Sequence, residues 1–175
     1  MEESSSMQQQ DVLIIGAGIA GASLAWRLAQ AGRSVLLLER EAQPGTHSTG
    51  RSAAMFMESY GPPGVRALTR ASRAFYLHPP AGFADQPLLH PRHALFVATP
   101  DQRAALAALG DELAATGTQL KLLNAEQIVQ AAPALKPGLF EQALLDTDGY
   151  DIEVDTLLQG FLRGARQAGA QLRSE

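Results

Sequence analysis

The sequence predicts an α/β fold that begins with a Rossmann-like β-α-β unit. Val12–Ile15 is a short apolar run rich in β-branched residues, which is typical of a buried parallel strand. Apolar residues recur at helical spacing across residues 20–30, and Gly32 follows as a C-terminal cap. Val35–Leu38 is a second apolar run. A helix between two parallel strands makes a right-handed crossover.

The rest of the chain mixes loops, helices and strands. Residues 42–61 are small, polar and rich in glycine, so we expect a loop there. Capping patterns and apolar stripes predict helices. The expected helices lie at residues 62–79, 100–115, 124–132 and 153–167. The expected strands lie at residues 94–98 and 143–145, and we expect a further strand after Gly169 to be cut off at Glu175.

Composition excludes several classes of protein. Hydrophobic residues make up 46% of the chain and charged residues 18%, with a net charge of −4, which is globular composition. The Lys and Arg residues are scattered, so we expect no nucleic-acid partner. The chain has no cysteine, which excludes disulfides, thiolate metal sites and a Cys-linked flavin. The histidines show no metal-ligand spacing, so we expect no metal.

The N-terminal residues predict no export and no membrane span. MEESSSMQQQ lacks the basic and apolar regions of a signal peptide. The apolar run at Val12–Ile15 is far too short to cross a bilayer. We expect a cytoplasmic protein with a disordered tail over residues 1–10.

The main chemical signal is the glycine-rich turn Gly16-Ala17-Gly18-Ile19-Ala20-Gly21. Gly16 makes the turn from strand to helix, Gly18 allows a pyrophosphate to approach the backbone, and Gly21 lets the helix pack near the strand. The helix N-terminus offers unpaired N–H groups and the positive end of a dipole. The turn therefore predicts a pyrophosphate site.

Glu39 ends the second predicted strand and supports the same interpretation. It follows Gly16 by twenty-three residues. A carboxylate at this place can accept hydrogen bonds from both hydroxyls of an adenosine ribose, and it repels a 2′-phosphate. Glu39 therefore disfavours NADP, while NAD and FAD both remain open at this point.

The loop after Glu39 favours a flavin. Residues 41–54 read EAQPGTHSTGRSAA. Hydroxyl side chains and backbone amides of this kind can pass under a phosphate and reach a flavin ring. NAD dehydrogenases normally continue into another β-α unit here.

Together these motifs resemble the FAD-dependent D-amino acid oxidase (DAO) superfamily. LEREAQPGTHSTGRSAA carries the resemblance, which continues in VRALTRASRAFY and GYDIEVDTLLQGFLRGAR. Within the superfamily, the chain is most similar to bacterial D-arginine dehydrogenases and their close relatives.

The resemblance implies a Rossmann-like FAD-binding domain with an interleaved α+β substrate domain. We therefore expect the chain to be truncated, as the N-terminal portion of a longer enzyme. Residues 11–60 are assigned to the FAD-binding β-α-β unit and the flavin loop. Residues 61–150 are assigned to part of the substrate or cap domain, and residues 151–175 to a truncated return helix.

The resemblance also implies roles for individual residues. Glu39 would hold the ribose, and Arg40 would flank the adenine side. Tyr60 lies on a loop that can close over the substrate, and Met55 lies near the flavin. The residues expected along the pyrophosphate are Gly16, Gly18, Ala20 and Gly21. The residues expected along FAD towards its ring are Ser48, Thr49, Gly50, Arg51, Ser52, Ala53 and Ala54.

The implied reaction is oxidation of a D-amino acid or related amine to the imino acid, by hydride transfer to flavin N5. The sequence does not identify the electron acceptor. D-arginine dehydrogenases have a His where this chain has Met55, and a Glu for the guanidinium where it has Ala94. The guanidinium of a buried substrate needs a charged partner, and Ala94 cannot provide one. We therefore expect no strong preference for substrates that carry a guanidinium.

Two other functions remain open from the sequence. One is a different flavoprotein of the same fold, such as a hydroxy-acid dehydrogenase or a hydroxylase. The other is an inactive fragment that only binds a nucleotide or a partner.

Overall fold

The computed structural model describes residues 9–175 and divides into two compact units. The first unit contains the described residues up to Ala54 together with Leu77–Leu88 and Ile152–Glu175. The second contains Met55–Tyr76 and Leu89–Asp151. The tail predicted over residues 1–10 lies largely outside the described residues.

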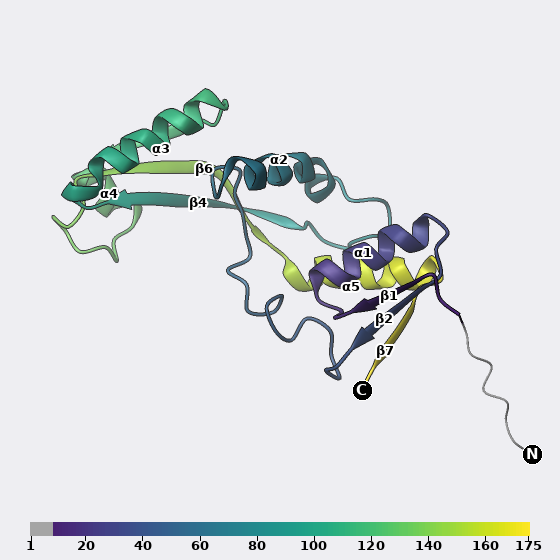
Figure 1. The fold of residues 1–175 in the computed structure, drawn as a ribbon. Coiled ribbons are helices and arrows are strands. Elements are labelled where there is room, and N and C mark those ends of the chain that lie inside the picture. The colour runs from purple at the N-terminus through teal and green to yellow at the C-terminus, as the bar shows by residue number, and fades with distance from the viewer. Residues whose placement is uncertain (1–8) are drawn as a thin grey trace, which may run out of the picture. The chain divides into compact units, whose positions relative to one another are not determined.

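The first unit is a parallel sheet with two helices (Figure 1). Its strands are β1 (Val12–Ile15), β2 (Val35–Glu39) and β7 (Gln171–Ser174), in the order β1-β2-β7. Its helices are α1 (Ile19–Gln30) and α5 (Val154–Gln167), which lie side by side. The predicted β-α-β unit is confirmed, since β1 and β2 pair in parallel.

The strand expected after Gly169 is present as β7. β7 forms, and it pairs in parallel with β2, with Leu172 opposite Leu37. The apolar residue after the Gly169 turn places this short segment in register beside β2, and four residues are enough for the ladder.

Aromatic packing holds α1 against α5. The ring of Trp26 on α1 lies 5.5 Å from the ring of Phe161 on α5 and 5.5 Å from that of Phe83. Gly164 makes room for this contact, because a Cβ there would lie 2.6 Å from Trp26 Nε1. Trp26 is therefore a packing residue.

The second unit is a four-stranded sheet around a long central strand, β6. β4 lies beside β6, while β3 and β5 pair with different stretches of it. The strands are β3 (Met55–Phe56), β4 (Leu89–Ala98), β5 (Leu120–Asn124) and β6 (Gln142–Ile152). The helices are α2 (Pro63–Leu77), the 3-10 turn η1 (Pro100–Gln102), α3 (Arg103–Ala115) and α4 (Ala125–Ala131).

Both predicted helix starts in this unit are confirmed as capping boxes. At α4, Asn124 Oδ1 accepts from Gln127 N at 2.9 Å, and the Gln127 side chain accepts from Asn124 N at 3.0 Å. At η1, the side chain of Gln102 accepts from Thr99 N at 3.2 Å. These reciprocal bonds satisfy N–H groups that a helix start leaves open.

The strands of this unit are longer and more numerous than predicted. The strands expected at residues 94–98 and 143–145 extend to Leu89–Ala98 and Gln142–Ile152, and β3 and β5 were not predicted. β5 pairs with β6 along its whole length, from Leu120 opposite Asp146 to Asn124 opposite Gln142. Whether such a segment forms a strand depends on pairing with a strand that is distant in the sequence. Local sequence patterns do not show this pairing.

The buried face of α2 is not formed by its apolar residues alone. Val65 and Leu68 lie at helical spacing and are apolar, yet they are 48% and 72% exposed. Arg66 is instead the buried residue of α2, and its guanidinium forms an ion pair with Glu112 of α3. The charged partner compensates for burial of the guanidinium, so Arg66 is buried in the first half of α2, while Phe75 and Tyr76 are partly buried in its second half.

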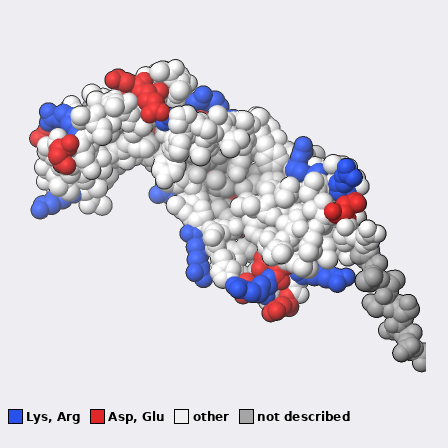
Figure 2. Space-filling view, viewed as in Figure 1, with Lys and Arg blue, Asp and Glu red and all other residues white. Residues whose placement is uncertain are grey.

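Surface charges are dispersed in the view of Figure 2, where Lys and Arg do not form a continuous basic face. Among the described residues, no cluster of three or more His, Asp or Glu is placed to hold a metal ion. Within residues 9–175, no helix combines the length and the apolar character needed to cross a membrane.

The aromatic packing gives a stability test. Phe161→Ala removes a ring that is 9% exposed, so we expect it to lower the free energy of unfolding by about 3–5 kcal/mol. Leu24→Ala, on a half-exposed position of α1, should cost less than about 1 kcal/mol. Urea unfolding monitored by circular dichroism measures both. Equal costs for the two variants would show that the α1–α5 contact is not part of the core.

Candidate dinucleotide-binding site

The glycine-rich turn joins β1 to α1 in a conformation that needs glycine. Gly16 has φ +98°, in the left-handed region, and its N–H donates to Leu38 O of β2 at 2.7 Å. Gly21 approaches the same turn closely, because a Cβ on it would lie 1.9 Å from Gly16 O. The turn therefore lies between a strand and a helix, as the motif predicts.

Glu39 is directed at this turn. Its Oε2 accepts from Ala17 N at 2.8 Å, and its Oε1 accepts from Glu41 N at 3.1 Å. The hydrogen bonds from Glu41 N and then Ala17 N lower the pKa of Glu39 below its ordinary value. The carboxylate is thus held ionised beside the first turn of α1.

The loop after β2 folds back onto the start of α1. Thr49 Oγ1 accepts from Ile19 N at 3.0 Å, which caps the helix from a position thirty residues away. Gly18 gives this hydroxyl its space, because a Cβ on Gly18 would lie 2.9 Å from Thr49 Oγ1. Gly50 N donates to Gly45 O at 2.7 Å and closes the loop on itself.

The end of the loop is held in an unusual backbone conformation. Ala54 has φ 55°, and it is the only described non-glycine residue with positive φ. Its N–H donates to Ser52 Oγ at 2.9 Å, and its carbonyl accepts from Ile152 N at 2.7 Å. These bonds maintain a conformation that costs energy, which is a frequent feature of ligand sites.

A cavity of about 360 Å³ lies between this loop and the start of α5. The loop residues that line it are Pro44, Gly45, Thr49, Gly50, Ser52 and Ala54. The sequence did not predict the other side, which consists of Ile152, Val154, Asp155 and Leu158. Leu158 belongs to the apolar stripe of α5, and a stripe alone does not distinguish core from cavity wall.

Arg40 forms a surface network rather than a contact with the turn. Its guanidinium pairs with Glu41 Oε1 at 2.9 Å, and its side chain is 78% exposed. His47 Nε2 lies 2.8 Å from the same carboxylate oxygen. These contacts, His47 first, lower the pKa of Glu41.

The remaining predicted loop residues lie at the surface. Ser48, Arg51, Ser52 and Ala53 are exposed. Within the described part of the chain, the Arg51 guanidinium forms no ion pair, although Arg51 N donates to His47 O at 3.1 Å. An exposed guanidinium with no carboxylate partner is available for an anion.

The predicted substrate-side residues belong to the second unit. Tyr60 is 67% exposed and follows the buried Ser59. Met55 lies on β3 and Ala94 on β4, and both are partly buried. Their roles towards a substrate remain predictions.

The first unit fits a pyrophosphate at the start of α1. Over residues 9–175, no acceptor is recorded for the N–H groups of Gly18 and Ala20 at the start of the helix. Such N–H groups, with the positive helix end, bind anionic oxygens. At Gly16 a built Cβ would meet no heavy atom within 4 Å, so the space beside this residue is open.

Substitution of Gly21 tests the close approach. Gly21→Ala places a Cβ against backbone, so we expect a loss of about 1–3 kcal/mol of unfolding free energy and weaker retention of flavin. Gly64→Ala is the control, because Gly64 on α2 has nothing within 4 Å of a built Cβ and its backbone suits alanine. Denaturant unfolding and visible absorbance measure both effects, and equal behaviour of the variants would contradict the packing role.

The lowered pKa of Glu39 predicts a pH dependence. A carboxyl whose folded pKa lies below its unfolded value stabilises the fold above the unfolded value, and this contribution is lost as pH falls through the folded pKa. The stability difference between the native protein and Glu39→Gln should stay constant from neutral pH to about 4.5 and shrink below that. Urea unfolding across this range measures it. A difference that grows on acidification would contradict the assignment.

Solved structures share this fold. Glycine oxidase from Bacillus cereus matches with a TM-score of 0.76 and 22% identity, over 95% of this chain and 46% of that one. L-α-glycerophosphate oxidase from Mycoplasma pneumoniae, with FAD bound, matches with a TM-score of 0.80 and 19% identity, over 96% of this chain and 45% of that one. At these identities the likeness shows the fold alone.

Curated relatives match over short stretches. The tRNA 5-methylaminomethyl-2-thiouridine biosynthesis bifunctional protein MnmC of Magnetococcus marinus is 51% identical over 45 residues, which is 26% of this chain and 7% of that protein. The probable electron transfer flavoprotein-quinone oxidoreductase YgcN of Escherichia coli is 64% identical over 36 residues, or 21% and 8% of the two chains. The chain thus spans less than half of the structures and a small part of the relatives described here.

The family comparison covers nearly the whole chain. The model of the family named DAO, FAD dependent oxidoreductase, matches residues 11–175. This match confirms the resemblance and the predicted fold class. The chain therefore belongs to the DAO family of FAD-dependent oxidoreductases, and FAD is its cofactor.

Proposed function

We propose that this chain takes part in the oxidation of a D-amino acid or a related amine by bound FAD. The observation that carries the proposal is the joint convergence of the glycine turn, the Glu39 carboxylate and the Thr49 hydroxyl on the start of α1. Membership of the DAO family supports the redox class. The substrate class rests on the sequence resemblance.

We assign the parts of the cofactor to residues of the first unit. The N–H groups at Gly18 and Ala20 bind the pyrophosphate, beside Gly16 and Gly21. Glu39 binds the ribose hydroxyls, for which its ionised state is required. Arg40 flanks the adenine side. The residues assigned to the remaining path along FAD are Ser48, Thr49, Gly50, Arg51, Ser52, Ala53 and Ala54.

Bound FAD would supply the acceptor for a hydride equivalent from the substrate Cα. The chain contributes position and charge. Thr49 ties the loop to α1, and the fixed Ala54 conformation orients the end of that loop. Arg51 is free to pair with a phosphate oxygen. None of these residues needs to act as an acid or a base.

The substrate side is proposed from the second unit. Tyr60, with its exposed ring, serves as a substrate lid, and Met55 lies near the flavin. Ala94 offers no charge to a guanidinium, so we infer a D-amino acid or secondary amine without a strong preference for arginine. The electron acceptor is not assigned, and the cytoplasmic location stays a prediction.

Anaerobic bleaching of the flavin by candidate substrates tests the proposal. The purified protein should show visible flavin absorbance. We expect several D-amino acids or secondary amines to bleach it, with D-arginine within about tenfold of the others in rate. The corresponding L-amino acids and 2-hydroxy acids are the control compounds. Stopped-flow absorbance gives the rate for each compound.

Three results would contradict the proposal. Bleaching by 2-hydroxy acids or glycerol phosphate alone would assign the chain to a hydroxyl-oxidising flavoprotein. A coloured protein that no compound bleaches would indicate a nucleotide-binding fragment. A rate of bleaching by D-arginine far above the rate for every other substrate would contradict the inference drawn from Ala94.

A further inference from the structure

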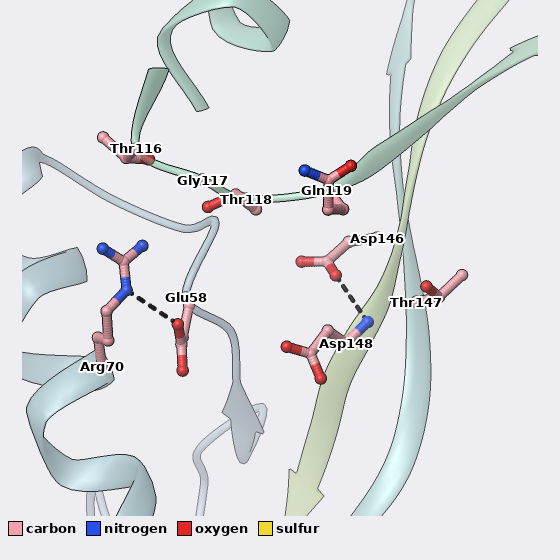
Figure 3. A pocket seen from close by; sticks show the side chains of 9 residues that line it. All are labelled: Glu58, Arg70, Thr116, Gly117, Thr118, Gln119, Asp146, Thr147 and Asp148. Carbon is pink, nitrogen blue, oxygen red and sulfur yellow. Dashed lines mark hydrogen bonds and ion pairs between the residues drawn. The ribbon is translucent and has the colours of Figure 1, made fainter. Parts of the chain in front are cut away.

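The second unit contains a polar pocket that the proposed flavin reaction does not use. Its volume is about 430 Å³, which exceeds the share of a single water, about 30 Å³. The turn between α3 and β5, the middle of β6, the segment before α2 and the middle of α2 form its walls (Figure 3). The lining residues used below are Glu58, Arg70, Thr118, Asp146 and Asp148.

Four of the charged groups at this pocket balance one another. Glu58 accepts from Arg70 Nε at 3.1 Å and from Arg73 Nη1 at 3.0 Å. Arg73 also binds Asp148, with distances of 2.7 and 3.0 Å to its two carboxylate oxygens. Two arginines are thus matched with two acids, and the pKa of Arg73 is raised, chiefly by Asp148.

Asp146 is the acid left without a cation. It is 2% exposed, and its recorded partners are both neutral. Its Oδ1 accepts from Asp148 N at 2.8 Å, and its Oδ2 accepts from the Ser59 hydroxyl. In the described part of the chain no Lys, Arg or His forms an ion pair with it. A buried carboxylate of this kind favours a cationic partner.

Thr118 supplies an independent observation. Its Oγ1 has no hydrogen-bond partner in the structure, alone among the fully buried side-chain nitrogen and oxygen atoms of the described, non-exposed residues. Buried polar atoms are normally paired, so an orphan atom beside a cavity calls for a ligand. In Figure 3 the Thr118 hydroxyl and the Asp146 carboxylate face the same open space.

We propose that this pocket binds a small organic molecule through a protonated primary amine. The ammonium donates to Asp146 and to Thr118 Oγ1, and its single positive charge balances the single unmatched acid. A divalent metal fits less well, because Ca²⁺ and Mg²⁺ require more oxygen ligands than these two residues offer. The proposal does not depend on the proposed flavin reaction and stands whether or not the proposed substrate class is correct.

Isothermal titration of the FAD-loaded protein with ethylammonium chloride tests this site, at constant ionic strength kept with tetramethylammonium chloride. Asp146→Asn and Thr118→Val should each weaken binding about tenfold or more, because each removes an acceptor for the ammonium. Thr118→Ser keeps the hydroxyl and should bind as the native protein does. Valine is close in shape to threonine, and Thr118→Val removes a hydroxyl that has no partner, so this variant should fold. It therefore still tests the site if Asp146→Asn fails to fold.

Asp148→Asn is the matched control. It changes the charge of the pocket by the same amount, but its carboxylate is already paired with Arg73. We expect less than about a threefold effect, since only the general field changes. If Asp148→Asn lowered the affinity for ethylammonium as much as Asp146→Asn does, binding would depend on the general negative charge of the surface, and the proposal would be wrong.

Other outcomes would also overturn it. Ethylammonium binding that survives both Asp146→Asn and Thr118→Val would place the amine elsewhere, including at a flavin site. Potassium chloride that competes with equal affinity would indicate a simple cation site. No measurable binding at millimolar ethylammonium would remove the site altogether.

Discussion

The hydrogen bond from Ala17 N to the Glu39 carboxylate joins the two chain segments on which the proposed cofactor site depends. It joins the turn after β1 to the end of β2, over a distance of 2.8 Å. The parallel ladder between the two strands brings these ends together. Close approach of Gly21 to Gly16 O then sets α1 directly behind the turn. An acid and a set of helix-start amides, the groups to which we assign the ribose and the pyrophosphate, therefore come together in one β-α-β unit.

The flavin loop extends this unit through a single side chain. Thr49 caps α1 at Ile19, and Gly18 provides the space for its hydroxyl. The loop end is then fixed at Ala54 by its bond to Ile152 N, so the segment is held at both ends. Fixed ends reduce the entropy lost when a ligand binds. The cavity beside α5 lies along this same segment.

Local sequence predicted what depends on local pattern. Apolar runs gave β1 and β2, capping residues gave the starts of η1 and α4, and glycine spacing gave the turn. Burial of Arg66 could not be predicted, because its partner Glu112 lies on a different helix. The exposed Leu68 and the unpredicted β5 were misjudged for the same reason: distant pairing decides both. The distance of Glu39 from Gly16 in the sequence predicted a role in ribose binding. The Thr49 cap joins residues thirty positions apart, so no local sequence pattern predicted it.

A crystal structure of the FAD complex tests the central claim most directly. We predict that pyrophosphate oxygens accept hydrogen bonds from the N–H groups of Gly18 and Ala20, while both Glu39 oxygens face the ribose hydroxyls of the adenosine. A diphosphate bound away from the start of α1, or a Glu39 carboxylate turned from the ribose into solvent, would contradict it.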